Sequence, residues 1–148
     1  MRILVVNGPN LQLLGKRKPD TYGRNSLKDV EKMLGVVAKE LGVKLEFFQS
    51  CVEGEIVEKI GGAGNDGFDG IVINPAAYTH TSVAIRDAIE ASALPAIEVH
   101  ISNVHKRENF RRVSLTAPVC VGQICGLGIK GYEWALRALL CVVKEKKS

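Results

Sequence analysis

Hydrogen-bonding side chains stand at the ends of four apolar or alternating runs in the sequence. These runs end in Asn7, Gln49, Asn74 and His100, and Asn10 follows three residues after the first. If the runs are parallel strands, their carboxyl ends meet at one edge of a sheet, which is where open α/β sheets bind ligands. Amides and an imidazole gathered there could orient a polar substrate and move a proton. The sequence therefore predicts a polar small-molecule site at this edge.

The hydrophobic pattern predicts the elements that must position these side chains. Short apolar runs and strict alternation indicate strands, and a period of about 3.6 residues indicates helices. The expected strands are 1–6, 43–49, 70–73, 95–99 and 119–124, and the expected helices are 27–41, 55–60, 81–91 and 132–143, with a short helix or loop at 103–112. Ser26 suits the N-cap of the first long helix, and Gly42 suits its end.

Strands that alternate with helices indicate a parallel sheet covered on both faces. The predicted fold is a flavodoxin-like, doubly wound α/β domain, with a five-stranded parallel sheet in the order 2-1-3-4-5 and helices on both faces. Another small Rossmann-type strand order is the alternative. We expect residues 1–148 to form one domain, in which residues 144–148 are a solvated tail.

The composition limits the partners and the compartment. A net charge of only +4 and 5% aromatic residues argue against a nucleic-acid-binding surface. The longest apolar stretch, 134–143, is interrupted by Arg137 and is too short to span a membrane, and the N-terminus is too abruptly polar for a signal peptide. Four cysteines without CxxC or framework spacing predict buried free thiols in a reducing cytosol. We therefore expect a cytoplasmic protein without membrane or nucleic-acid partners.

Motifs for cofactors do not occur where this fold would need them. The loop 7–11 has neither GxGxxG nor GxxxxGK[ST], and Pro9 removes a backbone N–H that a phosphate cradle would use. The glycine-rich stretch 61–64 precedes a strand, so it is expected to be a flexible connection. The histidines His80, His100 and His105 lack the spacing of a metal site. No metal or nucleotide cofactor is expected.

Several short motifs, spread in order over nearly the whole chain, match those of one enzyme family. The matching stretches are Asn7-Gly8-Pro9-Asn10-Leu11 with Tyr22-Gly23, Asn74 to Ser82, Glu98 to Asn103, Arg107 with Phe110-Arg111, and Gly126-Leu127-Gly128 with Gly131-Tyr132. The chain thus resembles the type II dehydroquinase family. The resemblance implies a hydro-lyase that removes water from 3-dehydroquinate by anti elimination through an enolate, giving 3-dehydroshikimate. It also implies that no metal, nucleotide or Schiff base takes part.

By this resemblance Tyr22 is the base that removes the proton next to the ketone. A phenol ordinarily ionises near pH ~10, so such a base needs a neighbouring cation, and Arg17 lies five residues earlier. Gly15 and Gly23 bracket this stretch, as they would in a hinged lid. Without the resemblance, Tyr22 would be expected merely to pack beneath a glycine turn.

The remaining site residues also come from the resemblance. His100 matches the general acid that protonates the departing hydroxyl, although a lone strand-end histidine is more often structural. The other matching positions are Asn10 and Asn74, which hold the enolate-stabilising water and orient His100; Ile101 and Ser102, whose backbone N–H groups bind the carboxylate; and His80 and Arg111, which bind the ring hydroxyls. Arg107 is a candidate supporting residue. The alternative is a solvated, basic helix face on which Glu108 pairs with Arg111 and Arg112.

Asp87 is the one site candidate that lies away from the strand ends. On the expected helix 81–91, Val83, Ala84, Ala88 and Ala91 have core-facing spacing, and Asp87 falls within that stripe. A buried carboxylate needs a partner, and a boundary position paired with Arg86 or solvated is the alternative. The resemblance implies trimers that stack into dodecamers, in which Asp87 reaches the site of a neighbouring subunit.

A second hypothesis belongs to a different class. The same fold could serve as a non-catalytic module that binds a small anion or a flavin, and a yellow, flavin-loaded protein without dehydratase activity would favour it. Aromatic biosynthesis and quinate breakdown use the same elimination, and the sequence leaves both roles open.

Overall fold

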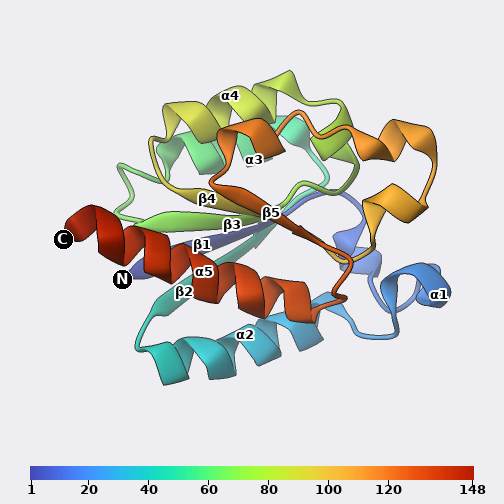
Figure 1. The fold of residues 1–148 in the computed structure, drawn as a ribbon, viewed down its shortest axis with the longest axis horizontal. Coiled ribbons are helices and arrows are strands. Elements are labelled where there is room, and N and C mark those ends of the chain that lie inside the picture. Colours follow the sequence, from blue (N-terminus) through green and yellow to red (C-terminus); the bar gives the residue numbers. More distant parts are fainter.

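A five-stranded parallel sheet forms the centre of the molecule in this computed structural model (Figure 1). Side chains are described for residues 1–146 and 148, and residue 147 is described by its backbone. The strands are β1 (Arg2–Asn7), β2 (Lys44–Gln49), β3 (Gly70–Asn74), β4 (Ala96–His100) and β5 (Gly122–Cys125). Their order is β2-β1-β3-β4-β5, and every neighbouring pair is parallel. The predicted flavodoxin-like topology is confirmed.

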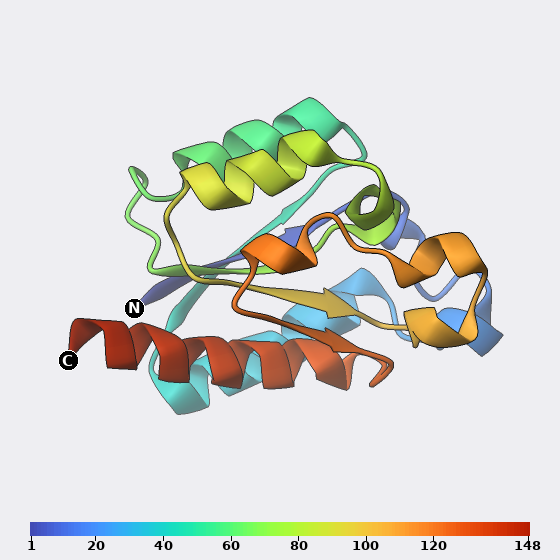
Figure 2. The same ribbon diagram turned by 45° about the horizontal axis from the view of Figure 1, so that its top comes forward.

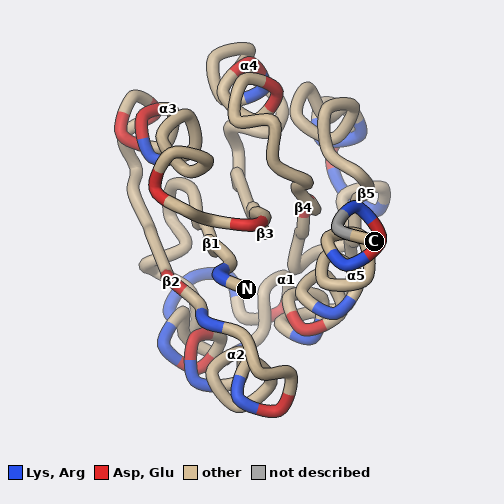
Figure 3. Tube along the Cα trace, turned by 90° about the vertical axis from the view of Figure 1, so that its left-hand side faces the viewer, with Lys and Arg blue, Asp and Glu red and all other residues tan. Residues whose placement is uncertain are grey.

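Two helices cover each face of the sheet (Figure 2). The pair α2 (Leu27–Leu41) and α5 (Lys130–Lys147) packs on one face, and the pair α3 (Glu53–Gly62) and α4 (Val83–Ala91) packs on the other. Seen along the strands, the charged residues lie mostly on the helices, and the central strands between them are largely uncharged (Figure 3). Burial of each Ile, Leu or Val in these two layers contributes about 1.5–3 kcal/mol.

The ends of α2 follow the sequence closely. The Ser26 hydroxyl accepts the Asp29 N–H at 3.2 Å, and the Asp29 carboxylate accepts the Ser26 N–H at 2.8 Å, which completes a capping box. Gly42 adopts φ 67° at the other end, a conformation that costs glycine little. Both predicted boundaries are confirmed.

Other boundaries differ from the expectation. Residues 117–119 form the 3-10 helix η5 (Ala117–Val119), and β5 begins only at Gly122, because Pro118 has no N–H to give to a strand. The helix α5 continues to residue 147, so most of the expected tail is helical, with exposed side chains at Lys144, Glu145 and Lys146. The polar segment after β4 holds the 3-10 helices η3 (Val104–Lys106) and η4 (Asn109–Arg112).

The predicted core face of α4 is wrong. Its buried side chains are Ile85, Ala88 and Ile89, while Val83, Ala84, Asp87 and Ala91 are exposed. The Ser82 hydroxyl caps the helix by accepting the Ile85 N–H at 2.9 Å, so the helix starts two residues later than expected. The larger apolar side chains Ile85 and Ile89 pack towards the sheet, and Asp87 is left on the outer surface.

The cysteines are free thiols, but only part of the expectation about them holds. All four are free, as predicted, whereas Cys51 and Cys141 are exposed and Cys120 and Cys125 are half-buried. No helix of the described residues is long and apolar enough to cross a membrane.

Candidate active site

The carboxyl ends of β1, β3 and β4 open onto a pocket that collects nearly all the predicted site residues. The pocket is lined by Asn10, Arg17, Tyr22, Asn74, His80, His100, Ile101, Ser102 and Arg111, with Arg107 and several loop residues. Asp87 is the exception: it lies exposed on α4, and the same chain does not bring it to the pocket. The site therefore forms at the switch point between β1 and β3, as this class of sheet favours.

Close contact between two loops places the asparagines. The Gly8 N–H donates to the Asn74 carbonyl at 2.8 Å, and a Cβ on Gly8 would meet the Pro75 carbonyl oxygen at 2.3 Å. Only glycine allows the backbones to approach this closely. The chain then turns through Asn10, whose φ of 70° is tolerated by asparagine better than by most residues.

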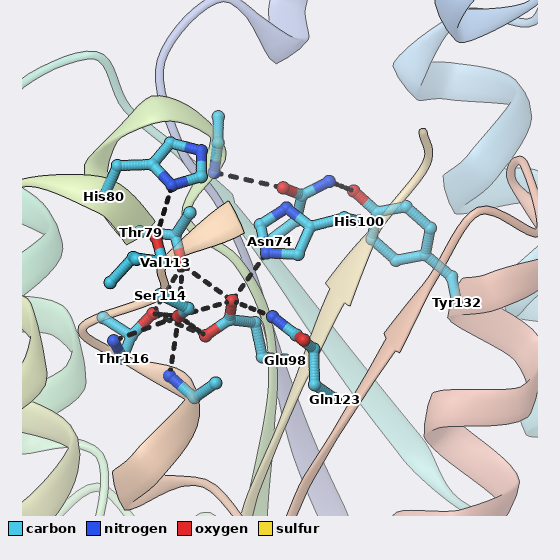
Figure 4. Close-up of polar contacts among 12 residues, drawn as sticks. Asn74, Thr79, His80, Glu98, His100, Val113, Ser114, Thr116, Gln123 and Tyr132 are labelled. Atoms are coloured by element: carbon cyan, nitrogen blue, oxygen red, sulfur yellow. Dashed lines mark hydrogen bonds and ion pairs between the residues drawn. The ribbon is translucent and has the colours of Figure 1, made fainter. Parts of the chain in front are cut away.

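His100 is held by a buried carboxylate two residues earlier on the same strand face. Its Nε2 lies 2.5 Å from Oε1 of Glu98, and both side chains are buried (Figure 4). Because an ionised carboxylate can only accept, Nε2 carries the proton of this bond. The other ring nitrogen, Nδ1, is therefore the one left to act on a molecule in the pocket.

A cluster of hydroxyl and amide groups surrounds Glu98 (Figure 4). The carboxylate accepts from Thr79 at 2.7 Å, from Ser114 at 3.0 Å and from Gln123 at 2.9 Å, and also from Thr116. Burial raises the pKa of Glu98, but the His100 hydrogen bond and charge, with the hydroxyl donors, outweigh burial and hold that pKa at about 2. Glu98 therefore stays ionised beside His100.

Two guanidinium groups flank the ring of Tyr22. Cζ of Arg17 lies 5.9 Å and Cζ of Arg107 lies 5.2 Å from the ring centroid. Arg107 is anchored in turn by a 3.2 Å hydrogen bond from Nη1 to the Ser102 hydroxyl. Tyr22 ends the single helical turn α1 (Pro19–Tyr22), which lies between Gly15 at φ 87° and Gly23 at φ 78°. The site therefore places two positive charges close to this ring.

His80 and Arg111 also line the pocket, and a hydrogen bond orients each side chain. Nδ1 of His80 bonds the Val113 carbonyl at 2.7 Å, which makes Nδ1 the protonated nitrogen and leaves Nε2 free. Nε of Arg111 donates to Glu108 at 2.6 Å. The intrahelical pairing considered from the sequence is therefore present, and Arg111 also lines the pocket.

Comparison with known proteins agrees with this geometry. Residues 1–140 match the family described as "Dehydroquinase class II". A 3-dehydroquinate dehydratase of Geotalea daltonii is 53% identical over 145 residues, which are 98% of this chain and 100% of that protein. The crystal structure of a type II dehydroquinase from Butyrivibrio crossotus superposes with a TM-score of 0.92 at 50% identity, covering 95% of this chain and 97% of that one. A type II dehydroquinase from Propionibacterium acnes gives a TM-score of 0.88 at 42% identity, with coverages of 97% and 96%.

This chain belongs to the class II dehydroquinase family. The sequence did not single out the roles of three residues in or around this pocket. Glu98 could have been found as an acidic residue inside an apolar strand, on the same face as His100. Arg107 was only a supporting candidate, because nothing in the sequence places it over Tyr22. Tyr132 belonged to a matching motif, and only the fold brings it beside Asn74.

The carboxylate of this dehydroquinase predicts a specific pH dependence of stability. The folded pKa of Glu98 is about 2, below the ordinary 4.5, so the unfolded chain binds the extra proton first. The stabilisation is complete above pH 4.5 and is lost as the pH falls towards 2. A shift of this size corresponds to roughly 3 kcal/mol.

Urea unfolding at pH 5.5 and at pH 3 measures this effect. The loss of unfolding free energy on acidification should be smaller in Glu98→Gln than in the wild type by a large part of that amount. Glu58→Gln, which removes an exposed carboxylate from α3, serves as the control. It should lose as much unfolding free energy on acidification as the wild type does. An identical acid loss in Glu98→Gln and the wild type would contradict the assignment.

Proposed function

We propose that this chain is a 3-dehydroquinate dehydratase whose pocket removes water from 3-dehydroquinate by anti elimination through an enolate, giving 3-dehydroshikimate. One observation supports this most strongly: a tyrosine with two guanidinium groups close to its ring shares the pocket with a histidine held by a buried carboxylate. Elimination next to a ketone needs such a base and such an acid. The relatives named 3-dehydroquinate dehydratase agree, and they match over nearly their whole length.

In the first step the Tyr22 phenolate takes the proton next to the ketone, and the electron pair moves to the carbonyl oxygen as an enolate. Arg17 and Arg107 stabilise the phenolate electrostatically. A water held by Asn10 and Asn74 donates to the enolate oxygen. Closure of the segment between Gly15 and Gly23 brings base and cation together over the bound substrate.

In the second step the enolate collapses, the carbon–oxygen bond of the β-hydroxyl breaks, and His100 gives that oxygen a proton from Nδ1, so that water leaves. Glu98 stabilises the imidazolium and fixes the ring. Ile101 and Ser102 bind the substrate carboxylate, and His80 and Arg111 bind the ring hydroxyls, since all four line the pocket. The reaction as proposed uses no cofactor.

Ultraviolet absorbance of the enone tests the function directly. The purified chain mixed with 3-dehydroquinate should produce the conjugated product at an enzymatic rate. That rate should persist after exhaustive chelation, and after borohydride treatment in the presence of substrate. No rise in the ultraviolet absorbance of the enone would instead support a non-catalytic module that binds a small anion. A yellow, flavin-loaded protein without activity would support a flavin-binding module. A lysine adduct after borohydride would mean a Schiff-base mechanism.

We also propose a cytoplasmic dodecamer built from trimers, in which Asp87 completes the site of a neighbouring subunit. The four free cysteines suit a reducing compartment. The outer face of α4 carries Val83, which is 57% exposed, together with the exposed Ala84 and Asp87. Arg86 donates to the Leu115 carbonyl at 3.0 Å, and no Asp87–Arg86 ion pair occurs within the described residues. An apolar face bearing an uncommitted carboxylate suits a subunit contact.

Subunit mixing tests the shared site. Tyr22→Phe and Asp87→Ala variants, each inactive alone, are unfolded, mixed and refolded together. Activity should return in part, because a chain with intact Tyr22 then meets a neighbour with intact Asp87. The control is each variant refolded separately. Recovery no greater than the sum of these controls, in proven mixed oligomers, would exclude sharing, and so would a fully active monomer in sedimentation.

A further inference from the structure

A fully buried tyrosine joins the asparagines that end two neighbouring strands. The hydroxyl of Tyr132, in the first turns of α5, donates to Oδ1 of Asn7 at 2.6 Å and accepts from Nδ2 of Asn74 at 2.9 Å. Tyr132 is 0% exposed, Asn7 is 1% and Asn74 is 3%. Asn7 and Asn74 are register partners on β1 and β3, so α5 inserts one hydroxyl between the ends of two neighbouring strands. Figure 4 shows this hydroxyl beside the Asn74 amide. Neither Tyr132 nor Asn7 lines the pocket, whereas Asn74 does.

These hydrogen bonds have a fixed direction. A tyrosine hydroxyl has one proton, and here that proton goes to Asn7. Its lone pairs are therefore turned towards Asn74 and can only accept from an N–H of that amide. At its other end, Oδ1 of Asn74 accepts the Ala76 N–H at 3.1 Å. If the Asn74 amide turned over, its oxygen would face a hydroxyl with no proton left, and its NH2 group would face another N–H.

We infer that Tyr132 is a positioning residue of the reaction, which acts by fixing the orientation of the Asn74 amide and itself depends on Asn7 for its direction. The inference rests on the proposed function. With one N–H of Nδ2 bound to Tyr132, the second N–H remains for the pocket, and the amide presents a donor to the bound water or substrate. A group held in this way needs no reorganisation when charge develops on the enolate, which is how preorganised donors lower a barrier.

Burial keeps the hydrogen bonds of the Tyr132 hydroxyl unchanged over the working pH range. It raises the pKa of Tyr132 far above its ordinary value of 10.0, and the Asn74 hydrogen bond opposes this rise only in part. The hydroxyl thus remains protonated throughout the working range. Loss of the hydroxyl should therefore lower the whole pH profile of kcat without shifting its limbs.

The test is Tyr132→Phe in the full chain, with kcat and KM measured for 3-dehydroquinate. We expect kcat to fall about tenfold, as for the loss of one oriented donor in the transition state, while KM changes less than about twofold. Asn7→Ala should lower kcat in the same way, because the hydroxyl proton is then free to turn towards Asn74. Tyr78→Phe is the matched control: its hydroxyl donates to the Cys51 carbonyl at 2.7 Å outside the pocket, and its loss should leave kcat unchanged.

A double-mutant cycle separates positioning from general damage to the fold. In an Asn74→Ala background, Tyr132→Phe and Asn7→Ala should have no further effect on kcat, because the group they position is gone. Effects that multiply would overturn the inference, as would a wild-type kcat in Tyr132→Phe. If Tyr132→Phe does not fold, Asn7→Ala alone decides through the same cycle. An inactive wild type, or an Asn74→Ala variant as fast as the wild type, would instead refute the proposed function or the role of Asn74.

Discussion

Tyr22→Phe should lower kcat at least ~10²-fold while KM changes much less. The variant keeps the aromatic ring but lacks the phenolic oxygen that accepts the substrate proton in the first step. The ring itself would still contact Arg17 and Arg107, whose guanidinium carbons lie 5.9 and 5.2 Å from its centroid. Substrate binding should therefore survive. Steady-state assays of enone formation measure both constants. A Tyr22→Phe variant with nearly the wild-type kcat would remove the tyrosine from the mechanism.

The contributions of Arg17 and Arg107 to kcat can be measured in the same assay. Arg17→Ala should lower kcat by at least ~10²-fold as well, because the phenolate loses a neighbouring positive charge. Arg107→Ala should act similarly and also release Ser102, to which Arg107 donates at 3.2 Å. Arg24→Ala is the matched control, because Arg24 is an exposed cation just beyond Gly23 and does not line the pocket. An equal loss in Arg24→Ala would mean that only the overall charge matters.

His100→Ala should abolish most of kcat but leave the first step running. The variant removes the acid for the departing hydroxyl, and a loss of at least ~10²-fold is expected. Tyr22 and its two cations remain, so the enzyme should still form the enolate and exchange the proton next to the ketone with solvent. Incubation in deuterated water, followed by mass spectrometry of the recovered substrate, measures this exchange against dehydration.

The control for this experiment is His105→Ala. His105 lies exposed in η3 and does not line the pocket, so both exchange and dehydration should stay at the wild-type rates. If His100→Ala slows exchange as much as dehydration, the histidine does not act separately on the second step. That outcome would place it in proton abstraction or in binding.

Most of the fold could be predicted because the local sequence signals, namely capping residues and apolar runs, match the helices and strands that the sheet requires. The Ser26 capping box and Gly42 set the limits of α2, and short, mainly aliphatic runs mark the central strands, which are buried on both faces. The errors lie where two local signals compete. Pro118 directly precedes the apolar run 119–124, which reads as a strand, and delays its start. On α4 the expected stripe of small apolar residues competes with Ile85 and Ile89, which face the sheet.

The site could be predicted in part for a related reason. The strand-end residues occupy the carboxyl edge by topology alone, so nine of the ten predicted positions line one pocket. Glu98 was missed because a charged residue in an apolar strand gives no sign of the five side chains that bind it. The contact between Arg107 and Tyr22 depends on the path of the chain through the 3-10 helices η3 and η4. The hydrophobic pattern of the sequence does not predict that path.

The bond between Tyr132 and Asn7 has a consequence for how the molecule folds. It joins residues 125 positions apart, and Asn7 lies on a strand made at the start of the chain. Loop closure over such a distance is entropically unfavourable until most of the intervening elements have formed. The first strands can therefore assemble during synthesis, but the orientation of the Asn74 amide is not fixed until α5 packs against the sheet. Full activity is therefore acquired only with the last helix, because a chain interrupted before Tyr132 has every strand of the sheet but lacks the hydroxyl that orients Asn74.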